Sequence, residues 1–70
     1  VAMSQPILRK GDRGESVKQL QSKLRDRGYT VAVDGIFGAK TLEAVKAYQA
    51  DHGLTVDGVA GKKTWSALNG

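Results

Sequence analysis

The chain has 70 residues with no cysteine, and its eleven Lys and Arg against seven Asp and Glu give a net charge of +4. This length makes one small domain that buries about 60% of its unfolded surface, which leaves little room for an enclosed active-site cavity. Without cysteine, disulfides and thiolate metal sites are excluded, and the positive charge, although ordinary for a small domain, favours anionic partners.

The N-terminal segment, residues 1–6, is interpreted as an expression remnant or a linker, and residues 7–70 as the domain itself. No signal peptide is visible, so the chain is expected to be a module excised from a larger protein that carries its own targeting signal. No apolar run approaches the roughly 18 residues of a membrane span, and no membrane contact is expected. Ile7 and Leu8 are expected to pack against the helices.

Three Gly-x-x-Gly steps predict three helix starts, at residues 11–14, 35–38 and 58–61. The second glycine of each step is expected at the N-cap, where glycine is acceptable, and the first in a conformation with positive φ. The predicted helices cover residues 15–27, 39–52 and 62–69. Gly28 and Gly53 are expected to end the first two.

Each predicted helix has one face that is expected to be buried. In the first, helical spacing places together Val17, Leu20, Gln21 and Leu24. In the second, the stripe contains Thr41, Leu42, Ala44, Val45, Tyr48 and Gln49. The third is about two turns long and needs the docking of Trp65 and Leu68, because so short a helix does not persist alone. The sequence therefore predicts an all-α, small three-helix bundle.

The links between the helices, residues 29–37 and 54–60, contain short alternating apolar segments. These segments can pair as a minimal sheet, or their apolar residues can simply fill the bundle, and the second reading is the simpler one. Two aromatic residues in the first link, Tyr29 and Phe37, are expected to be partly exposed, whereas Tyr48 and Trp65 are expected in the core.

An internal repeat dominates the second half of the chain. Residues 31–45, VAVDGIFGAKTLEAV, return as residues 54–68, LTVDGVAGKKTWSAL, with seven of fifteen positions identical at an offset of 23. In each copy an Asp-Gly turn precedes a helix, and the Asp carboxylate can accept backbone N–H bonds one or two residues on. Thr41 and Thr64 are expected to satisfy first-turn backbone groups. A functional alternative is that the two turns form the lip of a ligand groove.

The sequence fits the known patterns of catalytic and metal sites poorly. The segment from Gly58 to Thr64 has the wrong spacing for a phosphate-binding Walker loop. His52 is the only histidine, which makes a zinc site improbable and favours a role at a helix C-terminus. Asp34 and Asp57 are two carboxylates, as an acid/base pair requires, but no apolar surroundings are expected that would raise the pKa of one above that of the other. No catalytic residue, metal or cofactor is expected.

The whole pattern resembles the helical peptidoglycan-binding domain of bacterial and phage cell-wall hydrolases. The similarity runs from about Ile7 to Leu68 and rests on the turns, the helix faces, and the Leu-Gln and Tyr-Gln pairs. It is carried by the segments LRKGDRGESVKQLQSKL (8–24), GY (28–29), VDGIFGAKT (33–41), AVKAYQ (44–49) and GLTVDGVAGKKTW (53–65). Where this family often has Pro after each capping glycine, this chain has Glu15, Ala39 and Lys62, which also suit a first helical position.

The resemblance implies a three-helix fold and a non-catalytic role, in which the module holds an attached cell-wall hydrolase or remodelling enzyme on peptidoglycan. The implied partners are glycan strands or stem peptides and the attached catalytic domain, with the module monomeric. The implied location is the cell envelope or the extracellular space, whether secreted, periplasmic or delivered by phage. The ligand-binding hypothesis assigns Tyr29, Asp34, Phe37, Lys40 and Lys63. Phe37 stands out because Ala60 replaces it in the second copy.

Two other functions stay open. A small basic three-helix domain can bind nucleic acid, but about nine residues separate the second and third helices, and a helix-turn-helix needs a 3–4-residue turn. The third predicted helix offers few exposed polar residues for reading bases. A small hydrolase in its own right is the remaining alternative.

Overall fold

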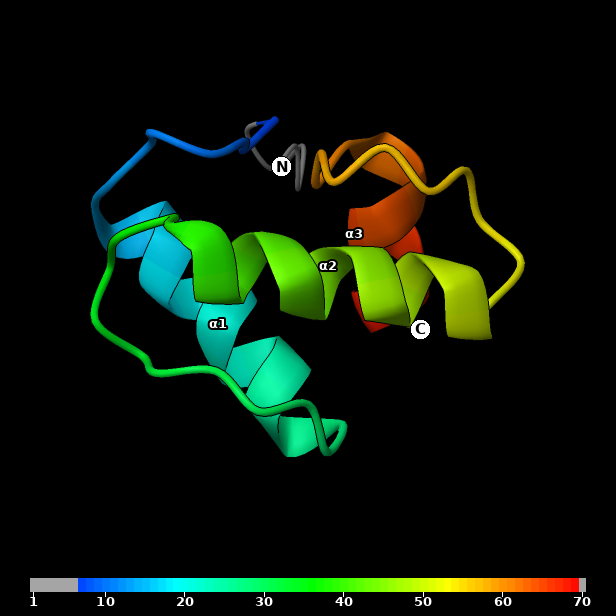
Figure 1. Ribbon diagram of the computed structural model, residues 1–70, viewed down its shortest axis with the longest axis horizontal. Coiled ribbons are helices and arrows are strands. Elements are labelled where there is room, and N and C mark those ends of the chain that lie inside the picture. The colour runs from blue at the N-terminus through cyan, green and yellow to red at the C-terminus, as the bar shows by residue number, and fades with distance from the viewer. Residues whose placement is uncertain (1–6, 70) are drawn as a thin grey trace.

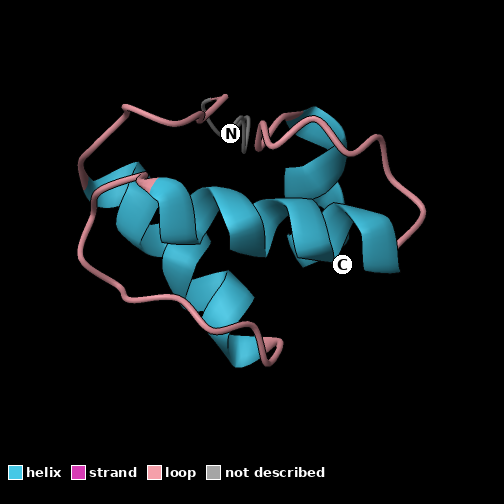
Figure 2. Ribbon diagram, in the orientation of Figure 1, coloured by secondary structure: helices cyan, strands magenta, loops and turns pink. Residues whose placement is uncertain are grey.

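The computed structural model describes residues 7–69. In this range the elements are α1 (Glu15–Asp26), α2 (Ala39–Asp51) and α3 (Lys62–Asn69), and the residues between them form loops rather than strands. Figure 1 shows the first part of α2 crossing α1 and the later part of α2 lying beside α3. Figure 2 shows the loops that join the three helices. The expected all-α, three-helix fold is confirmed, while residues 1–6, interpreted as a remnant or linker, lie outside the described part.

The helix boundaries follow the glycine steps. Gly14 and Gly38 are the N-caps of α1 and α2, as expected. The first two helices end one residue earlier than predicted, and α3 begins and ends where the sequence placed it. Gly58, in the turn before α3, has φ 73°, and a Cβ there would collide with Leu42 Cδ1. A side chain at Gly58 would therefore strain the backbone and would require the Leu42 side chain to move.

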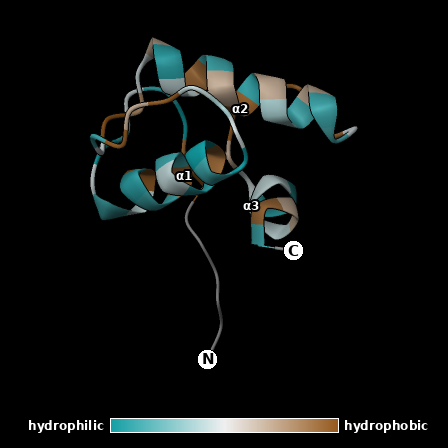
Figure 3. Cartoon of the chain, turned by 90° about the horizontal axis from the view of Figure 1, so that it is seen from below, coloured by the Kyte–Doolittle hydropathy of each residue, from teal (hydrophilic) through white to brown (hydrophobic). Residues whose placement is uncertain are grey.

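The core lies between the three helices and takes one side from each. Its central members are Val17, Leu20, Leu24, Val45, Tyr48 and Trp65, all at most 3% exposed. Figure 3 shows hydrophobic and hydrophilic stretches alternating along α1 and α2, as amphipathic helices require. The core positions predicted for Tyr48 and Trp65 are confirmed. In the described part of the chain, none of the helices combines the length and apolarity that a membrane span needs.

Residues 8–13, which precede α1, bond the backbone of both copies of the repeat. Leu8 forms an isolated antiparallel bridge with Ala60, and Gly11 N–H and Asp12 C=O bond the backbone of Phe37 at 2.9 Å each. Leu8 is buried as expected, whereas the same expectation for Ile7 is wrong, because its side chain is 59% exposed.

Phe37 corrects the sequence analysis. Its side chain is 1% exposed and belongs to the core, so the expectation of partial exposure is wrong. The physical reason is that backbone bonds from Gly11 and Asp12 hold the Phe37 backbone against the residues before α1, while the ring joins the core cluster. Its counterpart Ala60 is also fully buried, so the repeat demands an apolar residue at this position in both copies.

The alternating segments of the two links do not pair with each other. Among the described residues the isolated bridges join Leu8 to Ala60 and Arg13 to Ile36. The minimal sheet is therefore wrong, and the simpler reading is right for Val31, which is buried. It is wrong for Val33 and Val56, which are 37% and 51% exposed.

Candidate functional site

A buried glutamine on α1 organises the first Asp-Gly turn. The Gln21 side chain is fully buried, and its Oε1 accepts from the backbone N–H groups of Asp34 and Gly35, at 3.0 and 2.8 Å. Its Nε2 donates to Asp34 Oδ1, Ile36 O and Thr41 Oγ1, each at 2.9 Å. One amide thus ties the turn and the first turn of α2 to α1.

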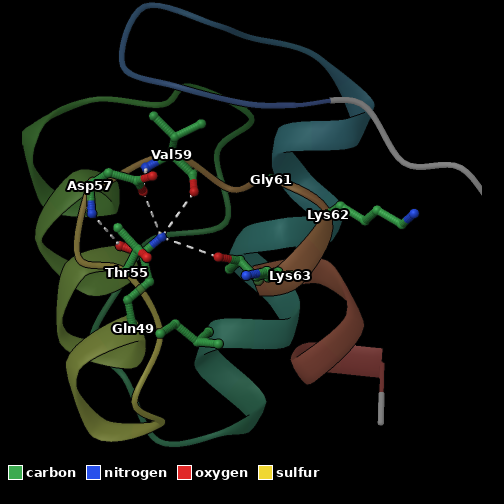
Figure 4. Close-up of a pocket in the computed structure, with 9 residues that line it drawn as sticks. Gln49, Thr55, Asp57, Val59, Gly61, Lys62 and Lys63 are labelled. Carbon is green, nitrogen blue, oxygen red and sulfur yellow. Dashed lines mark hydrogen bonds between the residues drawn. The ribbon is translucent and has the colours of Figure 1, made fainter.

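A second glutamine repeats the arrangement one helix later. Gln49, near the end of α2, accepts from Asp57 N–H at 3.2 Å and Gly58 N–H at 3.0 Å. Its Nε2 donates to Asp57 Oδ1, Val59 O and Thr64 Oγ1, at 3.0, 2.9 and 3.1 Å. Figure 4 shows this amide between the labelled Asp57 and Val59. We call each set of five bonds a glutamine clamp.

The two aspartates form the turns that the sequence predicts. Asp34 Oδ1 accepts from Ile36 N–H at 3.0 Å, and Asp57 Oδ1 accepts from Val59 N–H at 2.9 Å. These backbone bonds, followed by the bond from the clamp glutamine, lower the pKa of each carboxyl group below its usual value. Both carboxylates are therefore ionised at neutral pH and suit binding better than general-acid chemistry.

The two threonines serve the clamps. Thr41 and Thr64 are buried, and their hydroxyl oxygens accept from the clamp glutamines, Gln21 and Gln49. The Thr41 hydroxyl also donates to Ile36 O at 3.4 Å. The expectation that these hydroxyls satisfy first-turn backbone groups is wrong, because their bonds go to the clamp amides and, for Thr41, to a carbonyl that precedes α2.

Two open pockets lie against the clamped turns. The first pocket, beside the start of α2, has a volume of about 460 Å³, and the second, beside the start of α3, about 250 Å³. Eight of nine lining residues correspond at the repeat offset of 23. The pairs are Val31/Leu54, Ala32/Thr55, Asp34/Asp57, Ile36/Val59, Gly38/Gly61, Ala39/Lys62, Lys40/Lys63 and Thr41/Thr64. The internal repeat is thus a repeat of pockets as well as of helix starts.

The structure divides the predicted site residues among four places. Asp34 and Lys40 line the first pocket, and Lys63 lines the second. Phe37 lies in the core and lines neither. Tyr29 also lies outside both linings, although it adjoins Thr30 of the first pocket. The sequence analysis missed Gln21 and Gln49 as site-forming residues, although a glutamine on each apolar face ahead of an Asp-Gly turn was a visible signal.

Tyr29 belongs to an aromatic cluster at the end of α2. Its hydroxyl donates to Asp51 Oδ2 at 2.6 Å, and this bond, with lesser contributions from burial, raises the pKa of Tyr29 to about 12. Its ring meets Tyr48 edge to face with ring centroids 5.7 Å apart, and the His52 ring stacks on Tyr48 with centroids 4.1 Å apart. His52 Nδ1 lies 3.0 Å from Tyr48 O, which fits the expected place at a helix C-terminus. The described residues contain no group of three His, Cys, Asp or Glu side chains placed to hold a metal.

The chain is similar to known proteins in both sequence and fold. Residues 13–68 match the family described as "Putative peptidoglycan binding domain". A spore cortex-lytic enzyme of Bacillus cereus is 47% identical over 68 residues, covering 96% of this chain and 26% of that protein. The solved SleB N-terminal domain has a TM-score of 0.89 at 45% identity, covering 97% of this chain and 94% of that one. The solved Burkholderia AP3 phage endolysin has a TM-score of 0.88 at 51% identity, over 90% of this chain and 24% of that one.

Proposed function

The chain belongs to the peptidoglycan-binding domain family, and from this premise we propose that it is the wall-binding module of a larger cell-wall enzyme. The chain spans about a quarter of the length of the spore cortex-lytic enzyme that it matches. That protein and the phage endolysin are cell-wall enzymes by name, which supports a catalytic domain attached to this module. A place in the cell envelope or outside the cell follows from that role.

The observation that carries the proposal is the pair of equivalent pockets. Each has an ionised aspartate on a turn that a buried glutamine clamp holds, and a lysine in the first turn of the helix that follows, so the backbone that carries the binding groups is ordered before a ligand arrives. Peptidoglycan offers amide N–H groups, hydroxyls and stem-peptide carboxylates, which suit such pairs. Two modest sites on a polymeric target also raise the overall affinity through effective concentration.

The proposed ligand contacts follow from the pocket linings. Asp34 and Lys40 contact the ligand in the first pocket, and Lys63 does so in the second, where Asp57 joins it as the counterpart of Asp34. Phe37 supports the first turn from inside the core. The ligand contact of Tyr29 remains a prediction, since Tyr29 lines neither pocket.

Sedimentation with purified sacculi tests the proposal. The intact 70-residue chain should pellet with sacculi, and the double variant Lys40→Gln/Lys63→Gln should pellet at least about tenfold less, because each pocket loses its shared cation. A matched control, Lys10→Gln/Arg25→Gln, removes the same net charge at exposed residues outside both pockets. Equal losses in both variants would reduce the effect to general charge attraction.

The same assay separates the remaining alternatives. Failure of the unaltered chain to pellet would overturn wall binding itself. Release of labelled fragments from the sacculi by this chain alone would contradict a non-catalytic module and indicate a hydrolase.

A further inference from the structure

We propose that the second pocket binds the carboxyl-terminal end of a peptidoglycan stem peptide, with the terminal carboxylate at Lys63 and Lys62, and that the first pocket lacks this preference. The inference rests on the proposed function and narrows it to one chemical group at one pocket. Three features support it: the charges of the second pocket, its apolar wall, and its differences from the first.

The charges of the second pocket are arranged for a group with both a donor and an anion. Asp57 uses Oδ1 for its bonds with Val59 N–H and Gln49 Nε2, so its Oδ2 is available to a ligand N–H. Lys63 provides a cation across the same pocket, and Lys62 adds a second at the rim. Figure 4 shows the Lys62 side chain extending away from Gln49, so Lys63 is the principal contact and Lys62 joins it by rotation of its flexible stem.

This arrangement distinguishes a peptide end from a polymer of phosphates. The last residue of a peptide presents an amide N–H and a carboxylate a few ångströms apart, which match Asp57 and Lys63. A phosphate polymer offers no N–H to Asp57, and its negative charge is repelled by that carboxylate. An ionised Asp57 therefore selects against a purely anionic ligand.

The apolar wall agrees with a small terminal side chain. Leu54 and Val59 are both partly buried and line the pocket beside the polar groups. A volume of about 250 Å³ suits one or two small residues. A methyl group, as in a terminal alanine, can pack against this wall while the carboxylate reaches Lys63.

The first pocket is the internal control that the repeat provides. It has Ala39 where the second has Lys62, and Ala32 where the second has Thr55. The charged lining residues of the first pocket sum to zero, whereas those of the second sum to +1. Ile36, 51% exposed, adds apolar surface to the first pocket, which is also the larger of the two. The copies share a framework, an aspartate and one lysine, and differ at Lys62, the second cation that the second pocket offers to a carboxylate.

The test uses the 70-residue chain, uniformly labelled with nitrogen-15, titrated with N-acetyl-D-Ala-D-Ala and separately with its C-terminal amide. The free acid should shift the backbone amide signals of Thr55, Val59 and Lys63 more than those of their counterparts Ala32, Ile36 and Lys40. The amide should bind at least about tenfold more weakly, because it loses a charge-assisted bond. Lys63→Gln should cause the same loss, and Lys40→Gln should leave the second-pocket shifts unchanged.

Each other outcome overturns the inference. Equal binding of acid and amide would remove the carboxylate from recognition, and equal loss in Lys40→Gln would remove the distinction between the pockets. Shifts of the same amides by glycerol phosphate, at least as strong as those by the dipeptide, would assign the pocket to an anionic polymer. Sedimentation of the same sample with sacculi separates the two claims, since retained sedimentation without dipeptide shifts leaves wall binding standing and this assignment wrong.

Discussion

The side-chain nitrogen of Gln21 lies 2.9 Å from the hydroxyl oxygen of Thr41, although 20 residues separate them in the chain. Gln49 and Thr64 stand in the same relation, at 3.1 Å. Each contact joins one helix to the first turn of the next, across a loop that is also held by backbone bonds from the residues before α1. The positions of the pocket residues therefore depend on two buried amides, of which that of Gln49 also lines the second pocket.

Replacement of a clamp glutamine should destabilise the domain severely. Gln21→Ala removes the acceptor of the Asp34 and Gly35 N–H groups, and it also removes the donor to the oxygens that Nε2 bonds. Each buried polar group left unpaired costs about 1–3 kcal/mol. We expect the free energy of unfolding to fall by at least about 3 kcal/mol in urea titration. Gln19→Ala, an exposed change on the same helix, is the control and should stay within about 0.5 kcal/mol. Comparable losses in both variants would contradict the clamp.

Phe37→Ala should act on stability rather than directly on binding. Deletion of a ring that is 1% exposed removes core packing worth about 3–5 kcal/mol, a large share of what so small a domain has. Circular dichroism should show a lower midpoint of thermal unfolding, and any loss of sacculus binding should follow the unfolded fraction. The neighbour Ile36→Ala removes an exposed side chain and should leave the midpoint nearly unchanged. A Phe37→Ala variant with the original midpoint and weakened binding would restore Phe37 to the site.

Stability should fall in acid because of Asp34 and Asp57. Turn N–H groups hold the pKa of both carboxyl groups in the folded chain below the value of about 3.9 that is usual for the unfolded chain. As the pH falls below that value, the unfolded state therefore binds more protons than the folded state. Their contribution is present above about pH 4 and disappears as the pH falls through the folded pKa values. In Asp34→Asn/Asp57→Asn, urea midpoints measured between pH 5 and pH 2 should therefore depend less on pH than in the unaltered chain. Asp26→Asn, which touches neither turn, should keep the original slope; an unaltered slope in the double variant would count against the turns.

Alkaline pH should reveal the bond between Tyr29 and Asp51. A hydroxyl that donates to a carboxylate resists deprotonation, which raises the pKa of Tyr29 from 10.0 to about 12. This bond favours the folded state below pH 10, and its contribution is lost as the pH rises through about 12. Ultraviolet titration of tyrosinate, with Tyr29→Phe subtracted, should show the Tyr29 transition shifting toward 10 in Asp51→Asn. An unshifted transition would mean that Asp51 does not hold the phenol.

The helices were predictable because their signals are local. Glycine at both ends and a periodic apolar face placed α3 correctly and the other two to within one residue. The Asp-Gly turns were equally local, since each carboxylate accepts from an N–H two residues away. The assignment of Asp34, Lys40 and Lys63 to ligand binding stays a prediction, and the structure places these residues in the linings of two pockets rather than in one groove.

The errors came from contacts between distant segments. Gln21 was placed on a buried face, but its partners lie 13 to 20 residues away, and no local pattern names them. Phe37 was misjudged because its loop is covered by the residues before α1, whose path the loop sequence does not determine. Its exchange for Ala60 suggested freedom at an exposed position, whereas both residues are buried and differ only in size.

The place of α2 in both glutamine clamps has a consequence for how the domain opens. Its first turn receives Gln21 through Thr41, and its last turns supply Gln49 to the loop before α3. Loosening either loop therefore disturbs the helix on which the other loop depends. The two copies of the repeat therefore do not unfold independently of each other. The amide hydrogens of Gly35 and Gly58 should exchange with solvent at the rate set by opening of the whole domain.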